Sequence, residues 1–134
     1  MPVFQAPPSV LGKLTVDALF EAPTTFTYAA SYQIDTSIKN DYACSGTLTG
    51  DITFTFTNVA TNHQGLWAVR QDGTGGRLVT ITAPGGWTLY RDAGTASLAA
   101  ASAANAVTVY TYAFIAVGGL NMMYVGKLVP VVGP

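Results

Sequence analysis

The sequence predicts an all-β fold, an antiparallel β-sandwich or jelly roll of about eight strands. Three observations support this class. Apolar and polar residues alternate with period two in several runs, glycine or proline pairs separate these runs, and no stretch has a convincing helical pattern. At 134 residues the chain has the length of one domain. We expect an extended, proline-rich N-terminal arm over residues 1–12 and a single β domain over residues 13–134.

The N-terminal third begins with this arm, where Pro7-Pro8 favours a polyproline II course without ladder hydrogen bonds. Strict alternation over residues 13–20 predicts a strand with one buried face. A second alternating run over residues 24–34 predicts another strand, with Phe26 to Ile34 at every second position on one face. Residues 35–45 are polar and mixed, which indicates a loop.

The middle of the chain predicts a β-hairpin. Ile52, Phe54 and Phe56 alternate with threonines, as in a half-buried strand. The runs over residues 66–71 and 78–82 then flank the glycine-rich sequence QDGTGGR. Because polar, glycine-rich segments between alternating runs are typical of hairpin turns, we interpret these two runs as arms and QDGTGGR as their tip.

The last third predicts two more strands joined by a glycine turn. Gly85-Gly86 opens a loop that carries Trp87, and the alanine-rich segment over residues 97–106 is predicted as a second loop. Residues 107–117 are apolar or aromatic on both faces, which predicts a central strand buried on both sides. Gly118-Gly119 turns the chain into a partner strand over residues 122–129.

The composition is poor in charge. Charged residues make up 10% of the chain and hydrophobic residues 49%, whereas roughly 25% charged residues are usual for a globular domain. Such a surface leaves apolar patches, so we expect partners to cover part of it and a homo-oligomer to form. A formal net charge of −1 gives no electrostatic attraction for nucleic acid. No export signal or apolar span of membrane length is found. From the charge and from this absence, we expect neither nucleic acid nor a membrane as a partner.

Candidate catalytic and metal-binding groups are few. His63 is the one histidine and Cys44 the one cysteine, so a nucleophilic triad or a zinc site has too few ligands or bases within one chain. The GTGG segment is followed by Arg77 rather than by Lys-Ser or Lys-Thr, so it does not match a phosphate-binding loop. We expect no enzyme, no cofactor and no metal.

Exposed aromatic residues suggest one alternative. Trp87 and Tyr90, with Arg91 beside them, are candidate contacts for a carbohydrate because sugar faces stack on aromatic rings. Aromatic residues at alternate strand positions are more often part of a core or a subunit interface.

The segments GDITFTFTN, GLWAVRQDGTGGRLVTI, GGW and ANAV resemble a small β-rich module of tailed-bacteriophage virion proteins, of the tail-fibre and decoration type. The similarity covers residues 46–114. In that family a strand is followed by a glycine, a second strand ending in a QDGTGGR-like turn, a tryptophan-containing loop and an ANAV segment leading into the next strand.

This resemblance implies a virion structural protein, assembled in the host cytoplasm. We expect a head decoration protein, or capsid cement, that binds the major capsid protein or other virion proteins, with a homotrimer as the expected oligomer. Candidate capsid or subunit contacts lie in the arm, at Val3, Phe4, Pro7 and Pro8. The alternative is a tail-fibre or receptor-binding module that recognises host-surface carbohydrate through Trp87, Tyr90 and Arg91.

Overall fold

The computed structural model describes residues 23–38, 41–92 and 97–128. The arm with Val3, Phe4, Pro7 and Pro8 and the strand predicted over residues 13–20 lie outside these residues. The described part contains nine strands and no helix, which confirms the all-β class. The strands are β1 (Thr24–Phe26), β2 (Ser31–Asp35), β3 (Asp41–Cys44), β4 (Ile52–Thr57), β5 (Gln64–Arg70), β6 (Val79–Ile81), β7 (Thr88–Arg91), β8 (Val107–Val117) and β9 (Leu120–Lys127).

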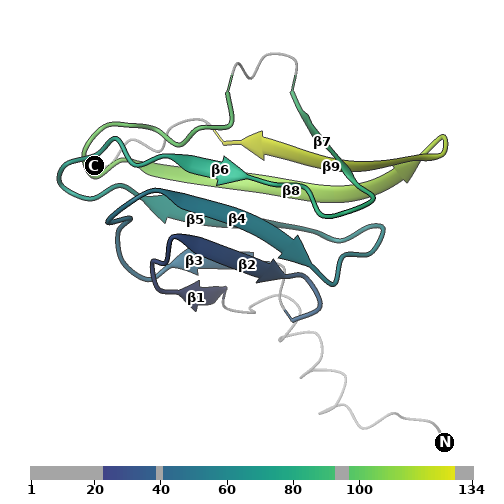
Figure 1. Ribbon diagram of the computed structural model, residues 1–134, viewed down its shortest axis with the longest axis horizontal. Coiled ribbons are helices and arrows are strands. Elements are labelled where there is room, and N and C mark those ends of the chain that lie inside the picture. The colour runs from purple at the N-terminus through teal and green to yellow at the C-terminus, as the bar shows by residue number, and fades with distance from the viewer. Residues whose placement is uncertain (1–22, 39–40, 93–96, 129–134) are drawn as a thin grey trace, which may run out of the picture.

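The strands form two sheets. One has six strands in the order β1-β3-β5-β8-β9-β7, and the other has three strands in the order β2-β4-β6. Figure 1 shows the three-stranded sheet in front of the larger one, with β4 over β5. Aromatic side chains fill the space between them, since the Phe54 ring of β4 lies 5.6 Å from the Trp67 ring of β5. The two sheets therefore share one core.

The expected antiparallel pairing is wrong for most of the described part. From β1 to β6 the chain crosses to the other sheet after every strand, and the pairs β1/β3, β3/β5, β2/β4 and β4/β6 are all parallel. A chain that leaves a sheet, runs through the opposite sheet and returns arrives in its original direction. Among the described strands, antiparallel pairing occurs only where β8 meets β5 and β9.

The predicted hairpin over residues 66–82 is therefore also wrong. Its two arms are β5 and β6, which lie in different sheets: β5 pairs with β3 and β8, and β6 pairs with β4. The QDGTGGR segment is a crossing between sheets. The hairpin predicted at Gly118-Gly119 is confirmed, because both glycines have positive φ angles, 57° and 81°, as a two-residue type I′ turn requires.

Three other boundaries differ from the prediction. The run over residues 24–34 is divided into β1 and β2, which belong to different sheets, and the expected loop over residues 35–45 contains β3. The expected loop after Gly86 contains β7, which pairs in parallel with β9. The alanine-rich residues 97–106 contain neither helix nor strand, as predicted.

Strand β8 lies between β5 and β9 in the larger sheet, so its central position is confirmed, but its burial on both faces is not. Thr108, Tyr110, Tyr112 and Phe114 are buried against the core, whereas the intervening residues are half-buried and Ile115 is 36% exposed. The six-stranded sheet thus has an apolar face that points away from the core.

Candidate functional site

The glycine-rich crossing from Gln71 to Arg77 is held by a buried amide. Gln71 is 1% exposed, and its side chain accepts a hydrogen bond from the Arg77 amide and donates one to the Arg77 carbonyl, each at 2.9 Å. This exchange imitates a pair of ladder hydrogen bonds between two strands. The side chain of Gln71 thus satisfies backbone groups where the chain leaves the sheet.

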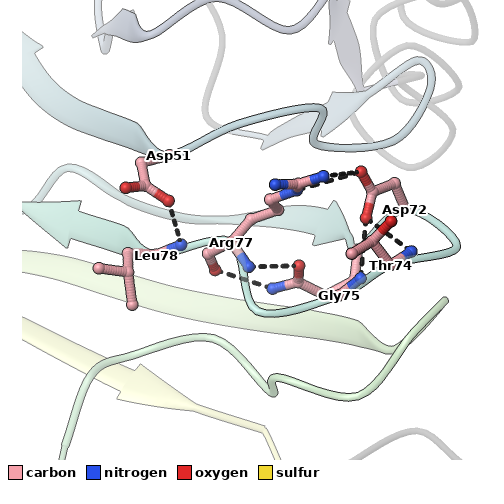
Figure 2. A network of polar contacts seen from close by, with 7 residues as sticks. Asp51, Asp72, Thr74, Gly75, Arg77 and Leu78 are labelled. Carbon is pink, nitrogen blue, oxygen red and sulfur yellow. Dashed lines mark hydrogen bonds and ion pairs between the residues drawn. The ribbon is translucent and has the colours of Figure 1, made fainter.

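Asp72 organises the rest of this turn. One carboxylate oxygen accepts hydrogen bonds from the amides of Thr74 and Gly75 at 3.0 and 2.8 Å, and the other accepts from the Arg77 guanidinium at 2.6 and 3.0 Å (Figure 2). The hydrogen bond from Arg77 is the main reason that the pKa of Asp72 lies below its ordinary value, and it raises the pKa of Arg77 in turn. The acid and base of the motif are thus engaged with each other and with the backbone.

The turn also contacts the segment that precedes β8. The amide of Gln71 donates to the Ala106 carbonyl, the amide of Asn105 donates to the Asp72 carbonyl, and the amide of Gly76 donates to the Ser102 carbonyl, at 2.8 to 2.9 Å. These hydrogen bonds link two segments that the sequence pattern treats separately. They give the glycine-rich turn a structural role at the edge of the core.

We expect the Asp72–Arg77 pair to contribute to acid sensitivity. Because the pKa of Asp72 is lower in the folded chain than in the unfolded chain, its contribution is present at neutral pH and is lost as the pH falls through the folded pKa. Asp72→Asn should therefore lower the melting temperature at pH 7 and reduce its further fall between pH 7 and pH 3, as measured by circular dichroism. Arg77→Gln should reduce that fall in the same way. An acid-induced fall as large as that of the wild type in both variants would contradict this role.

His63 lies in a second polar cluster, between β4 and β5. Its Nδ1 atom accepts a hydrogen bond from the Ala60 amide at 3.3 Å and lies 2.8 Å from the hydroxyl of Thr36. Thr36 is 4% exposed, and its hydroxyl oxygen also lies 2.9 Å from the Asn58 carbonyl oxygen. A nucleophile at Thr36 would have no access to a substrate. The cluster instead links the segment after β2 to the connection between β4 and β5.

Trp87, which directly precedes β7, and Tyr90 within β7 lie on opposite sides of the six-stranded sheet. Trp87 packs edge-on against Phe114, with ring centroids 5.0 Å apart, and so belongs to the core side. Tyr90 is 37% exposed and is paired in register with Tyr124 of β9, on the face that points away from the core. Arg91, at the end of the strand, is exposed. Trp87 and Tyr90 therefore do not form a common stacking surface.

A feature that the sequence interpretation missed is the outer face, by which we mean the side of the six-stranded sheet that points away from the core. The register places Leu66 of β5 beside Thr111 of β8, and Ala113 of β8 beside Tyr124 of β9. An open groove of about 440 Å³ lies here, lined by these four side chains together with Asp41, Gln64, Gly65 and Tyr112. The apolar residues on both sides of β8 were the available signal, but they were interpreted as burial on both sides.

Within the described residues, no group of three or more His, Cys, Asp or Glu side chains is placed to hold a metal ion. The described part of the chain also has no helix with the length and apolar character that crossing a membrane requires. Cys44 is half-buried and packs against the core.

Comparisons of the chain with protein-family models, with curated proteins and with solved structures find no match.

Proposed function

We propose that the chain is a structural protein of a tailed-bacteriophage virion, and that it acts as a head decoration protein that stabilises the capsid lattice. The observation that carries the proposal is the outer face. It is a largely apolar surface on a chain with only 10% charged residues, and the two polar clusters that we describe serve the fold. Such a surface favours assembly by burial of apolar area.

In this proposal the chain performs no covalent chemistry and needs no cofactor. Its partners are the major capsid protein or other virion proteins, together with further copies of itself, and its location is the virion. Arm residues Val3, Phe4, Pro7 and Pro8 are candidate contacts to the lattice. We assign the two facing sheets to the β-sandwich class, with a mixture of parallel and antiparallel pairs.

A cement protein should make heads more resistant to heat. Purified protein added to heads that lack it is expected to bind at saturable, regular stoichiometry and to raise the temperature at which the heads release DNA, followed with a DNA-binding dye. Deletion of residues 1–12 should weaken binding if the arm grips the lattice. Absence of binding to such heads would contradict the decoration role.

The second candidate is a tail module that binds carbohydrate. The exposed ring of Tyr90 and its partner Tyr124 favour it, since both are on the outer face. A glycan array that detects binding in the wild type and loses it in Tyr90→Ala, with Trp87→Ala much less affected, would support this function. An array without signal would remove it.

A further inference from the structure

We infer that residues 13–20 of this chain pair in parallel with the free edge of β2, as the fourth strand of the smaller sheet. These residues lie outside the part of the chain that the structure describes. The inference goes beyond the proposed function and does not depend on it. A chain with this pairing that does not bind phage heads would support the inference and contradict the decoration role.

The order of the strands gives the place of a strand before β1. From β1 to β6 successive strands alternate between the two sheets, and each strand from β3 onward lies in parallel beside the strand two before it. A strand that precedes β1 in this series belongs to the smaller sheet, next to β2 and parallel to it. Among the described strands none pairs with that side of β2, which is the edge of its sheet.

The backbone of β2 presents hydrogen-bonding groups on this edge. The amide of Thr36, directly after β2, donates to the Thr57 carbonyl of β4, so the even-numbered positions face β4. Because successive residues of a strand direct their amide and carbonyl to opposite sides, those of Ser31 and Gln33 point away from β4. Such a row of backbone groups is a template for another strand. A strand from the same chain would close this edge against pairing with a foreign chain.

The core is less covered at this edge than at its centre. Tyr32 of β2 lies against Phe26 of β1 and Tyr42 of β3, with ring centroids 4.3 and 6.2 Å apart, yet it is only half-buried. Phe54, the residue in register with it on the central strand β4, is fully buried. Figure 1 shows β1 and β2 at the same lower edge of the two sheets. An apolar strand beyond β2 would cover the exposed part of Tyr32.

The sequence of residues 13–20, KLTVDALF, suits this position. Apolar residues occupy every second place, as they do in β4, whose alternate residues are buried. The set that would face the core is Leu14, Val16, Ala18 and Phe20. The opposite set has one apolar member, Leu19, and is otherwise polar or charged. The segment thus has the pattern of a strand with one face on the core and one in solvent.

The connection is long enough for this strand to come from the same chain. If it ends at Leu19, four residues, 20–23, join it to β1, and the crossing from β1 to β2 also has four, residues 27–30. Five Cα-to-Cα steps reach about 17 Å, whereas packed sheets lie about 10 Å apart. With Leu19 level with the last residue of β2, Asp17 lies beside Gln33.

Disulfide formation between the two strands tests the pairing. In the full chain with Cys44→Ala, the pair Asp17→Cys/Gln33→Cys should form an intrachain disulfide, because neighbouring strands place Cα atoms about 4.8 Å apart, within disulfide range. Asp17→Cys/Thr80→Cys is the matched control, since Thr80 is exposed on β6 at the opposite edge of the same sheet. It should give at least about fivefold less intrachain disulfide on a non-reducing gel, with the linked peptides assigned by mass spectrometry.

A scan of the segment distinguishes a paired strand from a chain that only passes nearby. With Gln33→Cys kept in place, Asp17→Cys should be oxidised at least about fivefold more than Val16→Cys or Ala18→Cys, because alternate side chains lie on opposite faces of a sheet. Equal oxidation at the three neighbouring positions would contradict a strand. A disulfide that links two chains, in place of one within a chain, would show that a second copy supplies the segment and would contradict the same-chain pairing.

Hydrogen exchange of the unsubstituted chain is a second measurement, which does not depend on the folding of any variant. The amides of Ser31 and Gln33 should exchange at least about 100-fold more slowly than unprotected amides in NMR spectra, because each would donate to a carbonyl of residues 13–20. Exchange of both amides at the unprotected rate would overturn the inference. So would an Asp17→Cys/Gln33→Cys chain that forms no more intrachain disulfide than the control.

Discussion

Gly75→Ala is expected to destabilise the fold by about 3 kcal/mol or more. Gly75 has a φ angle of 75°, a left-handed conformation that costs an alanine about 1–2 kcal/mol. A Cβ atom at this position would also overlap the carbonyl oxygen of Ser102 and lie 2.8 Å from the Ala104 amide nitrogen. These are backbone atoms, so relief requires the segment before β8 to move, at a further cost of about 1–3 kcal/mol.

Gly76 provides a matched control for this prediction. It has the same φ angle of 75°, but a Cβ atom there would meet no heavy atom within 4 Å. Gly76→Ala should therefore cost only the conformational term, about 1–2 kcal/mol. Urea unfolding followed by fluorescence measures both variants. Equal losses of unfolding free energy in the two would show that the close approach of the Gln71–Arg77 turn to residues 102–104 does not constrain the fold.

Trp67→Ala is expected to lower the free energy of unfolding by about 3–5 kcal/mol, a large share of the stability of a domain of this size. Trp67 is fully buried, its ring stacks on that of Tyr110 at 4.7 Å, and it also contacts Phe54 and Phe56 of the opposite sheet. Its removal would leave a cavity between the two sheets.

Trp67→Phe is expected to be much milder. The indole Nε1 of Trp67 is buried and has no hydrogen-bond partner among the described residues, so phenylalanine loses ring volume but no hydrogen bond. Trp87→Ala, at a half-buried ring beside Phe114, should also cost less than Trp67→Ala. If Trp67→Phe proved as destabilising as Trp67→Ala, the indole nitrogen would have to be a structural donor.

Residue patterns predicted the strand positions better than the strand pairing. The alternation in β4 and the length of β8 were visible in the sequence, and the structure gives Ile52–Thr57 and Val107–Val117. The run over residues 24–34 looked continuous because Phe26, Tyr32 and Ile34 face the same core from two different sheets. Period-two alternation reports which side chains face inward, and it does not report which sheet a strand belongs to.

The Gln71–Arg77 segment shows the same limit for turns. Glycines and Asp72 indicate a reversal or a bend, and both a hairpin and a crossing between sheets satisfy that chemistry. Connection length is the better signal, since a two-residue glycine pair formed the hairpin at Gly118-Gly119. The hydrogen bonds from Gln71 to Arg77 depend on tertiary burial, so the sequence alone could not assign them.

The outer face was predictable only in part. Low charge indicated a covered surface, but the positions of Asp41, Arg70 and the groove follow from the register of β3, β5 and β8. Once β3 is known to pair with β5, Asp41 and Arg70 can be placed on the same face, near opposite ends of the β3–β5 pair. The candidate contacts in residues 1–12 and the trimeric state stay predictions.

The location of the protein on intact particles is the most direct test of a structural role in the virion. A gold-labelled antibody against the chain, imaged by electron microscopy on purified phage, should decorate the head surface at regular spacing. Label confined to the tail tip would instead support the carbohydrate-binding alternative. Particles that carry no label, while the protein is abundant in the infected cell, would contradict the account.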